Sequence, residues 1–213
     1  MKYTDFVNMH ANKKILVCGT GASVKAVPKE FIENHITIAT NDFCRLGIKI
    51  DYLVFGDRIK AMRHDPFNVE NNRAHYIKNF DAKYLFVHNY KENINHINED
   101  LQDRVIDARC NELLNEGVYS RLTPYHSNNS GFMAATIAIT MGAAKIGLIG
   151  IDFHGYHAFG KKHPNYLLST PDRIRRANKD YKNLSNIWKE VGIYNLNSFS
   201  KITTLPKIDY KEF

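Results

Sequence analysis

Six short apolar runs, separated by longer polar or helical stretches, are the feature of this chain that most constrains its fold. The runs lack the strict alternation of apolar and polar residues that marks a strand with one face in water. We therefore expect strands covered on both faces over residues 15–18, 36–40, 52–55, 84–88, 146–150 and 193–196. Such strands with helices between them predict a parallel, doubly wound α/β sheet flanked by helices on both faces.

Three helical segments are expected around these strands: one after Ser23, one over 131–141 and one over 171–191. Segment 131–141 contains mainly small and apolar residues, which predicts a helix packed tightly against the sheet and stopped by Gly142. Ser130 precedes it and is a natural N-cap.

Two segments, 58–80 and 88–125, are polar and rich in Asn, and their pattern leaves helices and binding loops equally open. No internal repeat, low-complexity stretch or linker divides the chain. Its 213 residues therefore predict a single domain over 1–213, large enough for a three-layer core.

Composition indicates a soluble globular protein, with 44% hydrophobic and 24% charged residues. No segment approaches the ~18 uninterrupted apolar residues of a membrane span, and residues 1–6 lack the apolar stretch of a signal peptide. Cys18, Cys44 and Cys110 are widely spaced and form no metal or disulfide framework. We expect a reducing, cytoplasmic environment.

The formal net charge of +7 would suit phosphorylated ligands, nucleic acid or an anionic surface. The charges are scattered apart from local clusters at 161–163 and 173–176, and no motif of DNA- or RNA-binding proteins accompanies them. A merely basic, solvated surface and a ligand-related one both stay open.

Small and polar residues gather where the expected strands end. The segments concerned are 19–23, 40–42, 56–58, 126–131 and 150–154. Each alone has a structural explanation as a turn or a cap. Because ligands of open α/β sheets collect outside the carboxyl ends of the strands, the five segments together predict a binding site on that rim.

The turn Gly-Thr-Gly-Ala-Ser over 19–23 is a candidate phosphate contact, because Gly19 and Gly21 allow a close backbone approach to an anion. It is not a Walker loop, since no Gly-Lys-Ser/Thr follows. It is not a full dinucleotide fingerprint either, since the third Gly is missing and position 24 is Val. A phosphate turn and a simple tight turn both remain open.

Residues 18–25, 40–41, 130–135 and 150–153 form an ordered pattern that resembles the bacterial lipooligosaccharide sialyltransferases. Motility accessory factor and 6-hydroxymethylpterin pyrophosphokinase-like proteins share the same framework. The resemblance implies a Rossmann-like fold of the GT-A-variant kind. For the sialyltransferases it also implies a CMP-sugar donor used without a metal or other cofactor.

Carried over position by position, the resemblance also implies site residues. Those near the donor phosphate, nucleotide and sugar are Thr20, Gly21, Ser23 and Asn41. Those that would hold the sugar carboxylate or phosphate are Asn129, Ser130 and Gly131. Those that would shape the base and ribose pocket are Gly150, Asp152 and Phe153. Asp57 takes a donor or acceptor position and is a catalytic candidate.

In the resembled enzymes, two tyrosines after the Ile-Asp-Phe segment bind the departing phosphate. Here His154 and His157 stand at the matching places, with Tyr156 between them. The family's general base is a histidine further along, in a Gly-His-Ser context, whereas the last histidine here is His163. Histidine can serve either role near neutral pH. A lid over 154–185 would add cations for the leaving phosphate, namely Lys161, Lys162, Arg173, Arg175 and Arg176.

The leading hypothesis is a metal-independent glycosyltransferase that moves a sugar, with a sialic acid-like sugar as one option, from a nucleotide donor to a glycan or other hydroxyl acceptor. One alternative is a Mg²⁺-dependent pyrophosphokinase-like phosphotransferase, with Asp42, Asp57 and Asp152 as metal ligands. Another is a nucleic-acid-directed transferase or binding protein. The short chain leaves little room for an acceptor domain, so completion of the site by a homo-oligomer or a partner subunit stays open.

Overall fold

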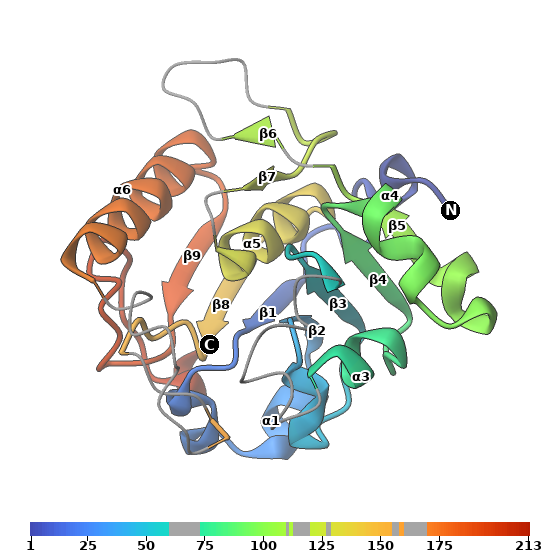
Figure 1. Cartoon of the computed structure of the whole chain (residues 1–213). Helices are drawn as coiled ribbons and strands as arrows, with labels where there is room; N and C mark the ends of the chain where they lie inside the picture. Colours follow the sequence, from blue (N-terminus) through green and yellow to red (C-terminus); the bar gives the residue numbers. More distant parts are fainter. Residues whose placement is uncertain (60–72, 110, 113–119, 127–128, 155–157, 160–169) are drawn as a thin grey trace.

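The computed structural model (Figure 1) describes the chain except for residues 60–72, 110, 113–119, 127–128, 155–157 and 160–169. At its centre is a seven-stranded sheet in the order β5-β4-β3-β2-β1-β8-β9, parallel throughout. The strands are β1 (Lys14–Cys18), β2 (Ile36–Thr40), β3 (Tyr52–Phe55), β4 (Tyr84–Val87), β5 (Val105–Asp107), β8 (Lys145–Ile149) and β9 (Gly192–Asn195). Outside it, β6 (Asn111–Glu112) and β7 (Tyr125–His126) form a short parallel pair.

Successive residues of each central strand enter two different cores, which is why the apolar runs show no strict alternation. In β1, Ile15 and Val17 belong to one buried cluster, whereas Leu16 and Cys18 belong to the other. The predicted parallel α/β fold is confirmed, and all six predicted strands lie within one residue of the observed bounds. The sequence did not predict β5, which is only three residues long.

Helices cover both faces of the sheet. On one face lie α5 (Ser130–Thr140) and α6 (Pro171–Ile187), and Figure 1 shows α5 crossing the middle of the sheet while α6 lies beside β9. The other face is covered by η2 (Ala22–Ala26), α1 (Lys29–Glu33), η3 (Phe43–Leu46), α3 (Arg73–Lys78), α4 (Tyr90–Asn93) and η5 (Ile94–His96). The other short helices of the described residues are η1 (Tyr3–Phe6), η6 (Glu99–Arg104) and η8 (Tyr210–Glu212).

Helix α5 is the most deeply buried of the described helices, since every residue from Gly131 to Thr140 is buried. Its small side chains allow it to pack closely on the sheet, and Gly142 follows it with a φ of +83°. The predicted helix is confirmed with a shift of one residue. The predicted N-cap is wrong by one position: the side chain of Asn129, not Ser130, accepts the Gly131 N–H at 2.8 Å. The Ser130 hydroxyl is therefore left for another contact.

Helix α6 buries Ala177, Tyr181 and Leu184 against the core. It ends at Ile187 rather than at the predicted residue 191, because Trp188 leaves the helical conformation before the turn into β9. Residues 171–185, the last part of the proposed lid, thus lie on a packed helix. Within the described segments, no helix has the length and hydropathy to cross a bilayer.

The Asn-rich segment after β4 supports the loop that follows β3. Asn89 donates its side-chain amide to the carbonyl of Gly56 at 3.0 Å. Asn93, which is fully buried, donates to the Asp57 carbonyl at 2.8 Å and accepts the Ile59 N–H at 2.8 Å. The segment that the sequence left open is therefore a support for the rim.

The order of the strands reverses between β1 and β8. From β1 the chain adds β2 to β5 on one side, whereas β8 and β9 lie on the other. In doubly wound sheets, ligands bind outside the carboxyl ends of the strands at such a reversal. The fold therefore predicts a ligand site at the loops after β1 and β8.

Candidate active site

The loops after β1 and β8 cross in direct backbone contact. Gly21 donates its N–H to the Gly150 carbonyl at 2.8 Å. A Cβ at Gly19 or Gly21 would lie 2.5 Å from the Gly150 oxygen. Gly150 itself has a φ of +68°, and a Cβ there would lie 2.2 Å from the Gly19 oxygen. Contact between the two loops is thus sufficient to require all three glycines, a reason that the sequence did not reveal.

Asp152 and Ser23 fix this crossing in place. The Asp152 side chain is only 4% exposed, and its carboxylate accepts the N–H and the hydroxyl of Ser23. The same carboxylate accepts the Asn197 amide at 2.8 Å, and the Ser23 hydroxyl oxygen accepts the Gly150 N–H at 3.2 Å. In this structure the polar atoms of Asp152 are engaged in holding loops together.

A second cluster forms where the ends of β2 and β3 meet the N-terminus of α5. The Ser130 hydroxyl donates to the Asn41 side-chain oxygen at 3.3 Å. A Cβ at Gly56 would lie 3.4 Å from the same hydroxyl, so the loop after β3 is also close. Asn41 has a φ of +54°, a left-handed conformation that Asn adopts more readily than most residues. We call Asn41, Gly56 and Ser130 the amide–hydroxyl cluster.

Ile151 joins the two parts of the rim. Its Cδ1 atom lies 2.5 Å from the positions that a Cβ would take at Gly19 and at Gly131. The side chain is thus wedged between the loop after β1 and the first turn of α5. The start of α5, where the helix dipole favours an anion, therefore lies beside the crossing loops.

His154 lies on the loop after β8, and its Nε2 atom is hydrogen-bonded to the carbonyl oxygen of Phe199. In the neutral ring with Nε2 as the donor, Nδ1 carries a lone pair that can take a proton. The preceding Phe153 has a φ of +56° and packs against the core that contains α5. His157 and His163 lie outside the described residues.

The chain after β8 passes across the loops of β1 and β2. Ala158 donates its N–H to the Thr20 carbonyl at 2.9 Å. The Arg45 guanidinium lies 3.9 Å from the centre of the Phe159 ring and pairs with Asp42 at 2.9 Å. This part of the chain thus contacts Thr20 directly and reaches Asp42 only through Arg45.

No group of three or more His, Cys, Asp or Glu side chains able to hold a metal ion occurs in the part of the chain that the structure describes. The three aspartates of the magnesium hypothesis are separated: Asp42 pairs with Arg45, Asp152 binds the loop network, and Asp57 is exposed after β3. Burial raises the pKa of the Cys18 thiol, at the end of β1, to about 12. This thiol stays protonated and is no nucleophile near neutral pH.

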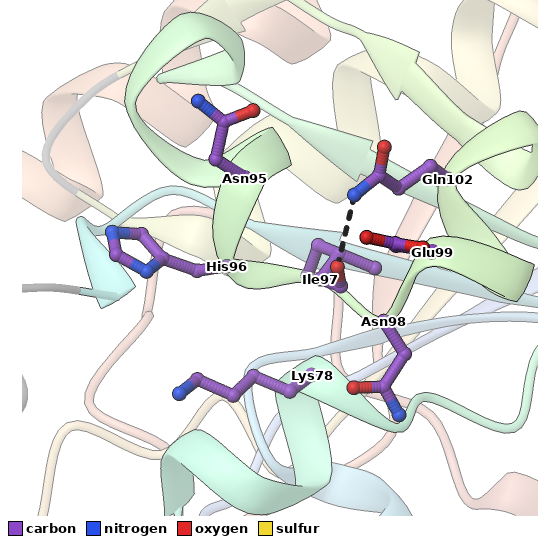
Figure 2. A pocket seen from close by; sticks show the side chains of 7 residues that line it. All are labelled: Lys78, Asn95, His96, Ile97, Asn98, Glu99 and Gln102. Carbon is purple, nitrogen blue, oxygen red and sulfur yellow. Dashed lines mark hydrogen bonds between the residues drawn. The ribbon is translucent and has the colours of Figure 1, made fainter.

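A polar surface hollow lies at the opposite end of the sheet (Figure 2). Its lining residues are Lys78, Asn95, His96, Ile97, Asn98, Glu99 and Gln102. They end α3 or precede β5, so they lie by the amino ends of β4 and β5. Gln102 donates to the Ile97 carbonyl at 3.1 Å across it. None of the predicted site residues lies there.

Asn197 and Phe199, on the loop after β9, also belong to the rim and were not predicted. They follow the predicted strand 193–196, so the rule that polar strand ends mark a site applies to them as well. Their contacts with Asp152 and His154, however, join residues 45 positions apart. Such contacts depend on the tertiary fold.

No protein-family model and no curated protein matches this chain in sequence. Among solved structures, the sialyltransferase CstII from Campylobacter jejuni in complex with cytidine-5′-monophosphate matches with a TM-score of 0.56 at 18% identity, over 93% of this chain and 85% of that chain. Its complex with the substrate analogue CMP-3FNeuAc matches with a TM-score of 0.54 at 18% identity, over 92% and 86%. The MAf glycosyltransferase from Magnetospirillum magneticum AMB-1 gives a TM-score of 0.55 at 13% identity, over 99% of this chain but 38% of that one.

These likenesses are to members of the two groups that the sequence resembles, and they confirm the expected fold. The chain spans little more than a third of the MAf protein.

Proposed function

We propose that this protein is a glycosyltransferase that takes a sugar from a nucleotide donor, with a CMP-sugar favoured, and passes it to a glycan or another hydroxyl-bearing acceptor. One observation carries the proposal: the amide–hydroxyl cluster meets the N-terminus of α5 beside the strand-order reversal. The similar fold of a sialyltransferase crystallised with CMP and a trisaccharide acceptor supports this choice of ligands.

The chemistry of the cluster suits a phosphate or a sugar carboxylate. Sugar transfer builds negative charge on the departing phosphate and positive charge on the sugar carbon. In the proposal, the side chains of Asn41 and Ser130 bind the anionic group, and the positive end of the α5 dipole stabilises its charge. The proposed reaction uses no metal, so lid cations such as Arg173 would help to neutralise the leaving phosphate.

The acceptor hydroxyl must lose a proton as it attacks the sugar. Among the described histidines of the rim, His154 can accept this proton at Nδ1, because its other ring nitrogen, Nε2, is hydrogen-bonded to the Phe199 carbonyl. His157, His163 and Asp57 are the other candidates for this role. A His154→Gln variant should slow the release of CMP from a CMP-sugar while leaving the affinity for CMP unchanged.

A thermal-shift series with CMP, UDP, GDP, ADP and ATP, each with and without Mg²⁺, tests the proposal. A ligand that binds only the folded chain raises the unfolding midpoint in proportion to ln(1 + [L]/Kd). We expect CMP to raise the midpoint without Mg²⁺. A shift with ATP and Mg²⁺ alone would favour the phosphotransferase, and a salt-steep affinity for DNA or RNA would favour the nucleic-acid alternative.

A further inference from the structure

The loop after β9 carries an unusually exposed aromatic ring. Phe199 is 81% exposed, more than any other large apolar side chain of the described residues. Single exposed apolar residues are common and need no explanation in themselves. Phe199 differs because its loop is firmly held and lies beside the candidate site.

Hydrogen bonds fix the loop on both sides of the ring. Phe199 donates its N–H to the Asn197 side-chain oxygen at 2.9 Å, and its carbonyl accepts the His154 hydrogen bond. Asn197 is bound in turn to Asp152, and the Ser200 hydroxyl donates to the Ile151 carbonyl at 2.8 Å. A preordered loop gives up little further freedom when a ligand binds to it.

Lys207 adds to this order from the chain that follows. Its ammonium donates to the carbonyls of Ser198 and Ser200 at 2.8 and 3.0 Å. The residues on either side of Phe199 are therefore both fixed through their backbone. The exposed ring stands on a rigid base rather than on a loose loop.

The strand order places this ring on the far side of the reversal from the amide–hydroxyl cluster. The cluster lies by the end of β2, and β9 is three strands away across β1 and β8. Neighbouring strands lie ~4.8 Å apart, so the two strand ends are separated by about 14 Å. If the anionic group of a ligand lies at the N-terminus of α5 and the ligand extends across β1 and β8, its other end lies near β9.

We propose that Phe199 is a stacking platform for the base of the bound nucleotide, an inference that rests on the proposed function. A nucleotide has an anionic phosphate at one end and a flat aromatic ring at the other, which matches the two sides of the rim. Aromatic side chains stack on bases in an offset geometry, and every base offers a suitable face. Phe199 thus contributes affinity for a base without selecting which base.

The test compares CMP with ribose 5-phosphate, which lacks the base, on the wild-type chain and on Phe199→Ala, Phe199→Leu and Phe199→Trp. NMR titration is the readout, because it also detects millimolar binding. The substitutions keep the backbone contacts of residue 199 and change only its ring. We expect Phe199→Ala and Phe199→Leu to weaken CMP binding about ten- to a hundred-fold, with Phe199→Trp close to wild type. The affinity for ribose 5-phosphate should not change.

Leu122→Ala is the matched control, since Leu122 is also exposed, at 56%. It lies at the other end of the sheet, because the carbonyl of the preceding Arg121 accepts a hydrogen bond from Thr140 at the end of α5. The variant should bind both ligands as the wild type does. An unchanged CMP affinity in Phe199→Ala, or an equal loss for both ligands, overturns the stacking proposal while the proposed function stands. Wild-type protein that binds no nucleotide refutes the proposed function, and this inference with it.

Discussion

The crossing of the loops after β1 and β8 and the amide–hydroxyl cluster lie on the same rim, yet they differ in how fully their polar atoms are engaged. At the crossing, the Asp152 carboxylate accepts three hydrogen bonds from Ser23 and Asn197. In the cluster, the side chains of Asn41 and Ser130 are joined by one hydrogen bond of 3.3 Å. Satisfied groups hold the fold, whereas groups with spare hydrogen-bonding capacity can bind a ligand. The two regions should therefore respond differently to substitution.

The largest loss of stability should come from Gly150→Ala. The new Cβ would lie 2.2 Å from a backbone oxygen that cannot rotate away, and the φ of +68° adds strain. We expect a loss of about 3 kcal/mol or more in the free energy of unfolding, measured by urea denaturation.

Gly47→Ala is the matched control for this strain. Gly47 has a φ of +65°, but a Cβ added there would meet nothing within 4 Å. Its substitution should cost only about 1 kcal/mol, the cost of the left-handed backbone alone. Equal losses in both variants would mean that contact between the loops is not what requires a glycine at position 150.

Asp152→Ala should have the next largest effect. It removes the acceptor for the Ser23 N–H and for the Asn197 amide in a buried place, which should cost about 2 kcal/mol. Asp209→Ala is a control that removes a cap accepting the Lys211 N–H on the surface, with an expected cost of about 1 kcal/mol or less. Calorimetric unfolding of both variants measures the loss in the free energy of unfolding. A smaller loss for Asp152→Ala than for Asp209→Ala would contradict the role of Asp152 in holding the loops together.

The sequence predicted six of the seven strands of the sheet because a buried parallel strand can be recognised from its own residues. Each is a short apolar run, such as 36–40 or 52–55. It did not predict β5 or the short helices α3 and α4, because segments of three to six residues contain too little periodicity. Their place is fixed by packing on neighbouring strands.

The site was predictable at the level of segments but not of contacts. Strand ends identified Asn41, Ser130 and Asp152 as members of one rim. Which of them would be engaged by the protein itself depended on partners far along the chain, such as Asn197 for Asp152. The same holds for Asn93, whose support of the loop after β3 becomes visible only in the folded chain.

The smallest effect on stability, and a clear effect on binding, is expected from Asn41→Gly and Ser130→Ala. Glycine accepts the φ of +54° at position 41 without strain and removes only the amide, so both variants should unfold within about 0.5 kcal/mol of wild type. Each should bind CMP about tenfold more weakly by calorimetric titration, because a hydrogen bond to a charged group is lost. Asn95→Ala, in the hollow at the other end of the sheet, is the control that should change neither quantity. If the cluster variants lost stability as Asp152→Ala does and kept their affinity for CMP, the cluster would belong with the crossing loops as part of the fold, and the ligand would have to bind elsewhere on the rim.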